Sequence, residues 1–70
     1  MDKKKYVEVT DKVIGVRGIS NGEWIFEFVD GSVKVFKAKE IEPGAFELIE
    51  KDGKVWGWCI ADTGQVFRYV

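Results

Sequence analysis

The sequence predicts an all-β domain, a small SH3-like or roll-type barrel of five to seven short antiparallel strands joined by hairpins. Four glycines each follow a residue that favours turns, at Asn21-Gly22, Asp30-Gly31, Asp52-Gly53 and Thr63-Gly64. The segments between these turns are rich in β-branched and aromatic residues and lack a helical periodicity. Closure into a barrel removes exposed strand edges, and an open, strongly curved sheet that dimerises through one face is the alternative.

Size and composition favour one domain without a structural metal or disulfide. The chain has 70 residues, one cysteine and no histidine, which excludes an internal disulfide and almost excludes a zinc site. Its net charge of -1 provides no overall attraction to nucleic acid or to anionic membranes. We expect a flexible basic tail at residues 1–5 and a single β domain at residues 6–70. The start lacks the apolar stretch of a secretory signal, so a cytoplasmic location is expected.

The first hairpin of the predicted meander turns at Ser20-Asn21-Gly22. A strand is expected from Tyr6 to Thr10, followed by a second strand that leads into this turn. A three-residue loop sets Val16 opposite Phe26 and places Arg17 on the outer face of the sheet. Glycines inside the predicted strands, at positions 15, 18 and 57, are typical of bulges or tight barrel corners.

The second hairpin spans Trp24 to Lys37 and is expected to turn in two residues, Asp30-Gly31. This register sets the charged side chains Glu27 and Lys34 opposite each other, and it matches aromatic residues with valines. It places three phenylalanine and tryptophan side chains of the first strand in the core. Phe36 then belongs to the outer face.

The second half of the chain follows a bend at Pro43-Gly44, where proline removes a ladder donor. A three-residue loop at residues 51–53 pairs Glu50 with Lys54. A two-residue loop at Thr63-Gly64 pairs Trp58 with Tyr69, and both aromatic rings are then expected in the core. These turns complete six or seven strands.

No residue pattern commits the chain to a reaction, so we expect no enzyme activity, cofactor or metal. Carboxylates, lysines or tyrosines would have to replace histidine as acid and base. The glutamates at positions 40, 42 and 47 are most simply a solvated loop, and Cys59 is most simply a small strand residue.

Surplus apolar area on the outer face favours a non-catalytic module that binds a protein or peptide. The expected partner-binding residues are Arg17, Ile25, Val29, Lys34, Phe36 and Lys37. Substitution of Phe36 by alanine should then weaken partner binding and leave the domain folded. The N-terminal strand or a second copy of the chain, giving a homodimer, could equally cover this face. An adaptor and a phage or plasmid inhibitor of a larger protein fit the pattern equally well.

A small barrel that binds single-stranded nucleic acid is the alternative function. Its expected residues are Lys34, Phe36, Lys37 and Lys39, with Arg17 as a further cation, because bases stack on aromatic rings and phosphates contact cations. Glutamates lie among these residues, which makes the protein-binding hypothesis the stronger one.

The chain also resembles a group of short bacterial proteins of unknown function. The resemblance rests on Phe28-Val29-Asp30-Gly31, on Gly44-Ala45-Phe46 with Ile49, and on Gly64-Gln65-Val66-Phe67. Members of that group carry a Phe-x-Asp-Gly hairpin and a Gly-x-Phe-x-x-Leu segment. This chain departs from the group at Phe67, where tryptophan is usual, and in ending at Val70 without a polar, acidic tail. The resemblance implies only a small, mostly β domain.

Overall fold

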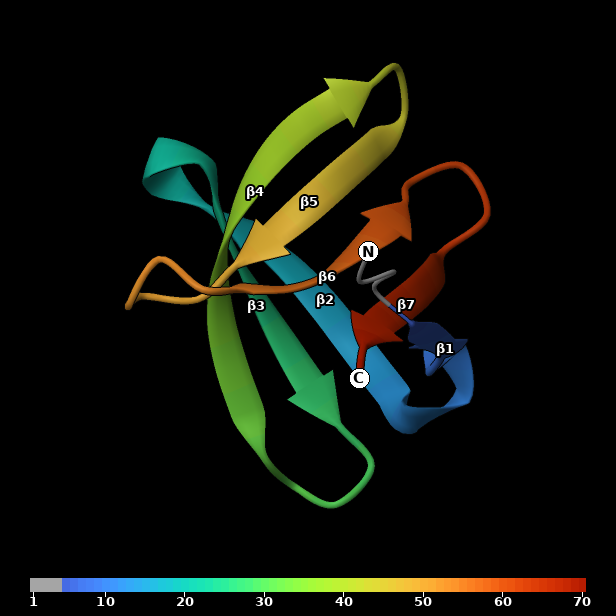
Figure 1. The fold of residues 1–70 in the computed structure, drawn as a ribbon. Helices are drawn as coiled ribbons and strands as arrows, with labels where there is room; N and C mark the ends of the chain where they lie inside the picture. The colour runs from blue at the N-terminus through green and yellow to red at the C-terminus, as the bar shows by residue number, and fades with distance from the viewer. Residues whose placement is uncertain (1–4) are drawn as a thin grey trace.

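Seven antiparallel strands form one sheet in the computed structural model, which describes residues 5–70, except for the side chain of residue 20 (Figure 1). The strand order in the sheet is β1-β7-β6-β5-β4-β3-β2. The bounds are Tyr6–Glu8 (β1), Val13–Ile19 (β2), Glu23–Phe28 (β3), Val33–Glu42 (β4), Ala45–Ile49 (β5), Val55–Ile60 (β6) and Gln65–Tyr69 (β7). The predicted all-β fold of antiparallel strands joined by hairpins is confirmed.

The two edges of the sheet, β1 and β2, are consecutive in the chain, and no ladder joins them. A single 3-10 turn, η1 (Thr10–Lys12), connects them, and a second one, η2 (Ser20–Gly22), connects β2 to β3. The Val9 N–H donates to the Val66 carbonyl at 2.8 Å, and the Val66 N–H donates to Thr10 Oγ1 at 3.0 Å. The sheet therefore curls and is bridged at one end by η1, but it does not close.

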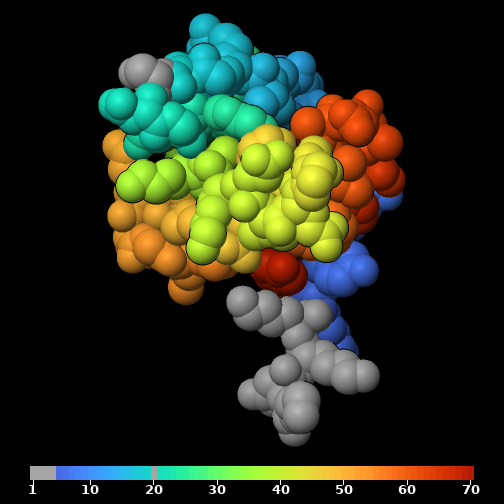
Figure 2. Space-filling view, turned by 90° about the horizontal axis from the view of Figure 1, so that it is seen from above, coloured from blue at the N-terminus to red at the C-terminus, as the bar shows by residue number. Residues whose placement is uncertain are grey.

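Most of the tail predicted at residues 1–5 lies outside the described residues. Lys5 is described, and its carbonyl accepts a hydrogen bond from the Val70 N–H at 2.9 Å. Figure 2 shows β4 and β5, in green to yellow, between the cyan β2–β3 hairpin and the orange turn that joins β6 to β7.

Two of the predicted loops are confirmed. Ile19 pairs with Glu23 across a three-residue loop, and Val16 lies opposite Phe26 as expected. At the β5–β6 turn the Glu50 N–H donates to the Lys54 carbonyl at 2.8 Å, which closes the expected three-residue loop. The bend at Pro43-Gly44 is also present, but β4 continues to Glu42 before it.

The two-residue turn expected at Asp30-Gly31 is wrong. The Phe28 N–H donates to the Ser32 carbonyl and the Gly31 N–H to the Phe28 carbonyl, both at 2.9 Å, so Val29 joins the loop as a third residue. Gly31 takes a φ of 88°, which is the left-handed conformation that this loop type requires at its last position. The Asp30 carboxylate holds the loop by accepting hydrogen bonds from the Ser32 N–H at 2.8 Å and hydroxyl at 2.6 Å.

The extra loop residue shifts the β3–β4 register by one. Phe26 lies opposite Lys34 and Trp24 lies opposite Phe36, whereas Glu27 lies opposite Val33. A shift of one residue exchanges the faces of a strand. Phe36, expected on the outer face, is consequently in the core and is 0 % exposed.

A bulge in β6 overturns a second expectation. Val55 lies opposite Ile49 but Gly57 lies opposite Leu48, so Trp56 is the additional residue. Trp56 is buried, and the strand beyond the bulge faces the opposite way from the expected register. A side chain at position 57 would meet the backbone of β7, with a Cβ 3.0 Å from the Arg68 Cα and closer still to the Phe67 carbonyl oxygen, which explains the glycine.

The β6–β7 loop is also longer than expected. Ile60 pairs with Gln65 and Trp58 with Phe67, so four residues form the loop instead of two. Trp58 and Tyr69, both expected in the core, lie on the outer face with Phe67.

The core lies on the concave side of the sheet. It is built by Val9, Phe26, Phe36, Leu48, Trp56, Cys59 and Val66, with Val13, Trp24, Phe28 and Phe46 packed against it. The ring centroids of Phe36 and Trp56 are 4.8 Å apart, and those of Phe26 and Phe36 are 5.3 Å apart. Aromatic packing therefore supplies most of the interior of this small domain.

Candidate binding surfaces

The six residues expected to bind a partner do not form one surface. Arg17 and Ile25 are cross-strand partners on the outer face, and Ile25 is paired in turn with Val35 on β4. Lys37 lies on the same face, where it pairs with Glu23 and Ile49. This half of the expected site is present as a mixed patch of cations and aliphatic side chains.

The other three expected residues lie elsewhere. Phe36 is buried, so it contributes nothing to a surface. Lys34 lies on the inner side of β4, and its Nζ is 3.2 Å from Glu50 Oε1. Val29 lies in the β3–β4 loop and is exposed. The nucleic-acid hypothesis loses its stacking residue with Phe36, although Lys37 and Lys39 remain exposed on β4.

An apolar groove at the open seam was missed by the sequence analysis. On β2, the inner-face residue Val16 is 46 % exposed, because none of the described strands pairs with the outer edge of β2 to cover it. The groove has a volume of 360 Å³ and runs between β2 and the β6–β7 hairpin. Its walls include Val16, Gly18, Trp24, Ile60, Ala61 and Val66.

Two further apolar side chains of β2 are exposed to solvent. Ile14 is the residue skipped at a bulge between Val13 and Gly15, and Ile19 ends the strand. Both are exposed. Exposed isoleucines in a strand that also contains two glycines were the available signal for an edge, but the sequence alone does not show which strand lacks a neighbour.

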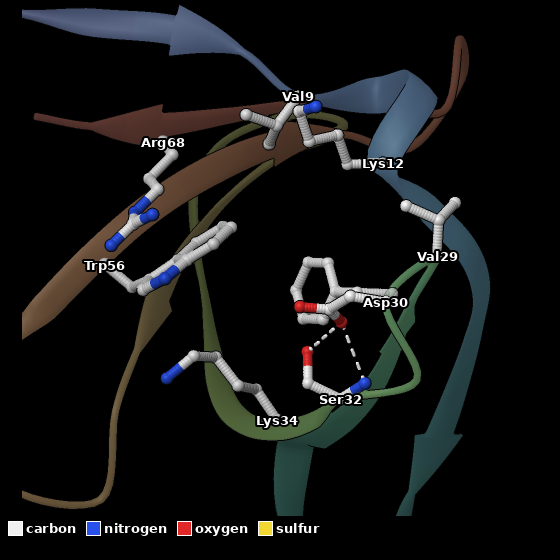
Figure 3. A pocket seen from close by; sticks show the side chains of 9 residues that line it. Val9, Lys12, Val29, Asp30, Ser32, Lys34, Trp56 and Arg68 are labelled. Carbon is white, nitrogen blue, oxygen red and sulfur yellow. Dashed lines mark hydrogen bonds between the residues drawn. The ribbon is translucent and has the colours of Figure 1, made fainter.

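A second pocket opens at the opposite end of the interior, beside η1 and the β3–β4 loop (Figure 3). It has a volume of 390 Å³ and includes the cationic side chains of Lys12, Lys34 and Arg68. Trp56 and Phe28 provide aromatic walls. The lining residues come from four separated parts of the sequence, 9–12, 28–34, 56 and 68, so no local sequence motif predicts the pocket.

Four aromatic side chains cluster on the outer face. The rings of Trp58 and Phe67 are stacked with centroids 4.2 Å apart, and Tyr6 packs its edge against both at 5.6 and 5.8 Å. Tyr69 lies edge-on to Tyr6 at 6.5 Å. Because Tyr6 belongs to the three-residue β1, this cluster fastens an otherwise short edge strand to the sheet.

The residues considered for chemistry in the sequence are a buried thiol and three glutamates in two strands. Cys59 is buried, and desolvation raises the pKa of its thiol to about 11, so it stays protonated at neutral pH. The glutamates at positions 40, 42 and 47 lie in β4 and β5 rather than in the expected solvated loop. Within residues 5–70, no group of three potential metal ligands is present.

A search of the same residues finds no helix that is long and apolar enough to span a membrane. Comparisons of the chain with protein-family models, curated proteins and solved structures give no significant match.

Proposed function

We propose that the domain is a non-catalytic module that binds an extended segment of a partner protein as an additional strand beside β2. The observation that carries this proposal is the outer edge of β2, which is seven residues long, pairs with no strand of residues 5–70 and lies next to the apolar groove at the seam. Strand addition uses main-chain hydrogen bonds for affinity and side-chain pockets for specificity.

The edge of β2 is weakly protected against pairing. Proteins commonly block an edge strand with proline, inward-pointing charges or bulges. β2 contains no proline, and Arg17 is its only charged residue. Its bulge lies at Ile14, near the start, so the stretch from Gly15 to Ile19 remains regular.

The groove determines what kind of segment fits. Side chains of an added strand alternate between the two faces, and those on the inner face would contact Val16, Trp24 and Val66. A volume of 360 Å³ suits one or two aliphatic side chains. The partner segment should therefore alternate apolar residues with polar ones, as β strands with one buried face do.

The test is selection of binders from a displayed library of eight-residue peptides with aliphatic residues at alternate positions. The affinity of selected peptides would be measured by fluorescence anisotropy against Val16→Lys and, as matched control, Val33→Lys. Both valines are exposed, but Val33 lies on β4 and does not line the groove. We expect at least a tenfold loss of affinity for Val16→Lys alone, with an unchanged free energy of unfolding.

Amide hydrogen exchange gives the second readout. Bound peptide should slow exchange along residues 15–19, and N-methylation of alternate peptide amides should abolish binding because it removes the ladder donors. Equal affinity for the two lysine variants would overturn the proposal. A thymidine oligonucleotide forms a further arm, and its salt-dependent binding in place of any peptide would support the nucleic-acid alternative instead.

A further inference from the structure

The pocket beside η1 is a second candidate site, separate from the groove at the seam. The two share no lining residue and lie at opposite ends of the interior. The inference drawn from it is independent of the proposed peptide binding.

Cationic side chains from three elements converge on this pocket. Lys12 belongs to η1, Lys34 to β4 and Arg68 to β7, and Figure 3 shows them around one opening. Within residues 5–70, Lys34 pairs with Glu50, whereas Lys12 and Arg68 form no ion pair. The Arg68 guanidinium carbon lies 5.7 Å from the centre of the Trp56 ring. A cation–π contact does not use the N–H groups of the guanidinium, so these donors stay available to a ligand.

One acidic side chain, Asp30, also lines the pocket. Its carboxylate accepts hydrogen bonds from the Ser32 hydroxyl and N–H, which lower its pKa and keep it charged at neutral pH. Asp30 is thus bonded within its own loop, and because Glu50 neutralises Lys34, two cations, Lys12 and Arg68, stand against the one carboxylate. The lining carries an excess of positive charge.

A buried donor without a partner adds an independent observation. Trp56 is only 7 % exposed, and its indole Nε1–H has no hydrogen-bond partner among the described residues. A buried donor left unsatisfied is unfavourable, and such groups are rare in native proteins. In Figure 3 the indole lies at the wall of the pocket, and its nitrogen is on the side of Arg68 and Lys34, where an acceptor oxygen would complete its bonding.

The remaining walls are apolar. Val9, Phe28 and Val29 complete a volume of 390 Å³, which exceeds the space that a bare inorganic anion fills. We propose that this pocket binds an organic anion, in which a carboxylate or phosphate group meets Arg68, Lys12 and the Trp56 indole N–H while an aromatic or aliphatic body packs against Phe28 and Val9.

The test is a titration followed by the indole ¹H–¹⁵N signals in nuclear magnetic resonance spectra. Phenyl phosphate and phenylacetate are the probes, and benzyl alcohol is the uncharged control. We expect the Trp56 signal to shift with each anion, while Trp24 and Trp58, which lie outside this pocket, serve as internal references. The tighter of the two probes identifies whether the natural oxyanion is a phosphate or a carboxylate.

Two variants separate charge recognition from apolar binding. Arg68→Gln and Lys12→Gln should each weaken anion binding about tenfold, because hydrogen bonds to charged groups are among the stronger ones. Lys51→Gln, in the β5–β6 loop, does not line the pocket, so it is the matched control and should leave the affinity unchanged. Added salt should weaken binding further.

Three results would overturn the inference: no shift of the Trp56 signal up to about 10 mM probe, equal binding of benzyl alcohol, or equal affinity of the Arg68 and Lys51 variants. Val16→Lys, which tests the groove, should leave anion binding intact. Failure at one site is thereby distinguishable from failure at the other.

Discussion

Phe36 shows how one side chain can change role when a register shifts. Placed on a surface, it would serve as an anchor for a partner. Buried between Phe26 and Trp56, it forms the centre of the aromatic core. The same residue is thus far more informative about stability than about binding.

We therefore predict that Phe36→Ala destabilises the domain instead of merely weakening a partner contact. Removal of a fully buried phenylalanine costs about 3–5 kcal/mol, because the loss of apolar contacts is accompanied by a cavity. Urea denaturation measures this change in the free energy of unfolding. Val33→Ala, at an exposed position on the same strand, is the control and should change stability by less than about 0.5 kcal/mol. A folded Phe36→Ala variant of unchanged stability would contradict the buried register.

Cys59 provides a prediction in alkaline solution. Burial raises the pKa of its thiol from 9.0 to about 11, so the unfolded chain loses this proton at a lower pH than the folded one. The contribution of the protonated thiol to stability is complete below about pH 9 and declines as the pH rises toward 11. Comparison with Cys59→Ala isolates this effect from the titration of tyrosines and lysines.

The measurement is the free energy of unfolding of both proteins from about pH 8 to about pH 11. The difference between wild type and Cys59→Ala should move toward a less stable wild type as the pH rises. A difference that stays constant over this range would show that the thiol ionises equally in both states.

Among the elements, the hairpins show how far the sequence could predict the fold. Turn residues located every hairpin. Charge pairing correctly selected the three-residue loop at residues 51–53, and the matching of Val16 with Phe26 correctly selected the one at residues 20–22. At Asp30-Gly31 a two-residue loop and a three-residue loop both end in a residue with positive φ, so Gly31 is compatible with either. Opposite charges on Glu27 and Lys34 favoured the shorter loop, but burial of Phe36 and the Asp30–Ser32 hydrogen bonds outweigh that surface pair.

The sequence predicted where the bulges lie, but it did not predict how they change the register of the strands. Gly15 and Gly57 were expected to mark irregular positions, and the register shifts beside both of them. The sequence does not indicate whether such a glycine adds a residue to the ladder. Both bulges add a residue, Ile14 in β2 and Trp56 in β6, and the bulge in β6 turns Trp58 outward.

The short strand β1 depends on aromatic contacts, which yields a prediction. Tyr6 packs against Trp58, Phe67 and Tyr69, and such pairs contribute about 0.5–1.5 kcal/mol each. Tyr6→Ala should detach β1, so that the amides of residues 67–69 exchange hydrogen faster than those of β4 and β5. Tyr6→Phe retains the ring and should preserve protection. A uniform rise in exchange across the sheet would instead indicate global destabilisation.

On the scale of the whole molecule, both candidate sites arise where the curled sheet fails to close. The groove needs an unpaired β2, and the pocket needs η1 beside the β3–β4 loop. Lys12, Trp56 and Arg68 are far apart in the sequence, so composition and spacing could not bring them together. Only Lys34 and Val29 of the expected binding residues line a candidate site, and they do so for a different reason from the one expected.

The pairing of β1 with β7 has a mechanical consequence. Tyr6 lies opposite Tyr69, and the Lys5 carbonyl accepts a hydrogen bond from the Val70 N–H. The start of β1 and the end of β7 are therefore neighbours. Hydrogen bonds between antiparallel strands run across the strands, so a force that separates residues 5 and 70 loads them one after another. Tension would unzip β1 at low force rather than shear it, and it would widen the seam against β2 while β3 to β6 remain intact.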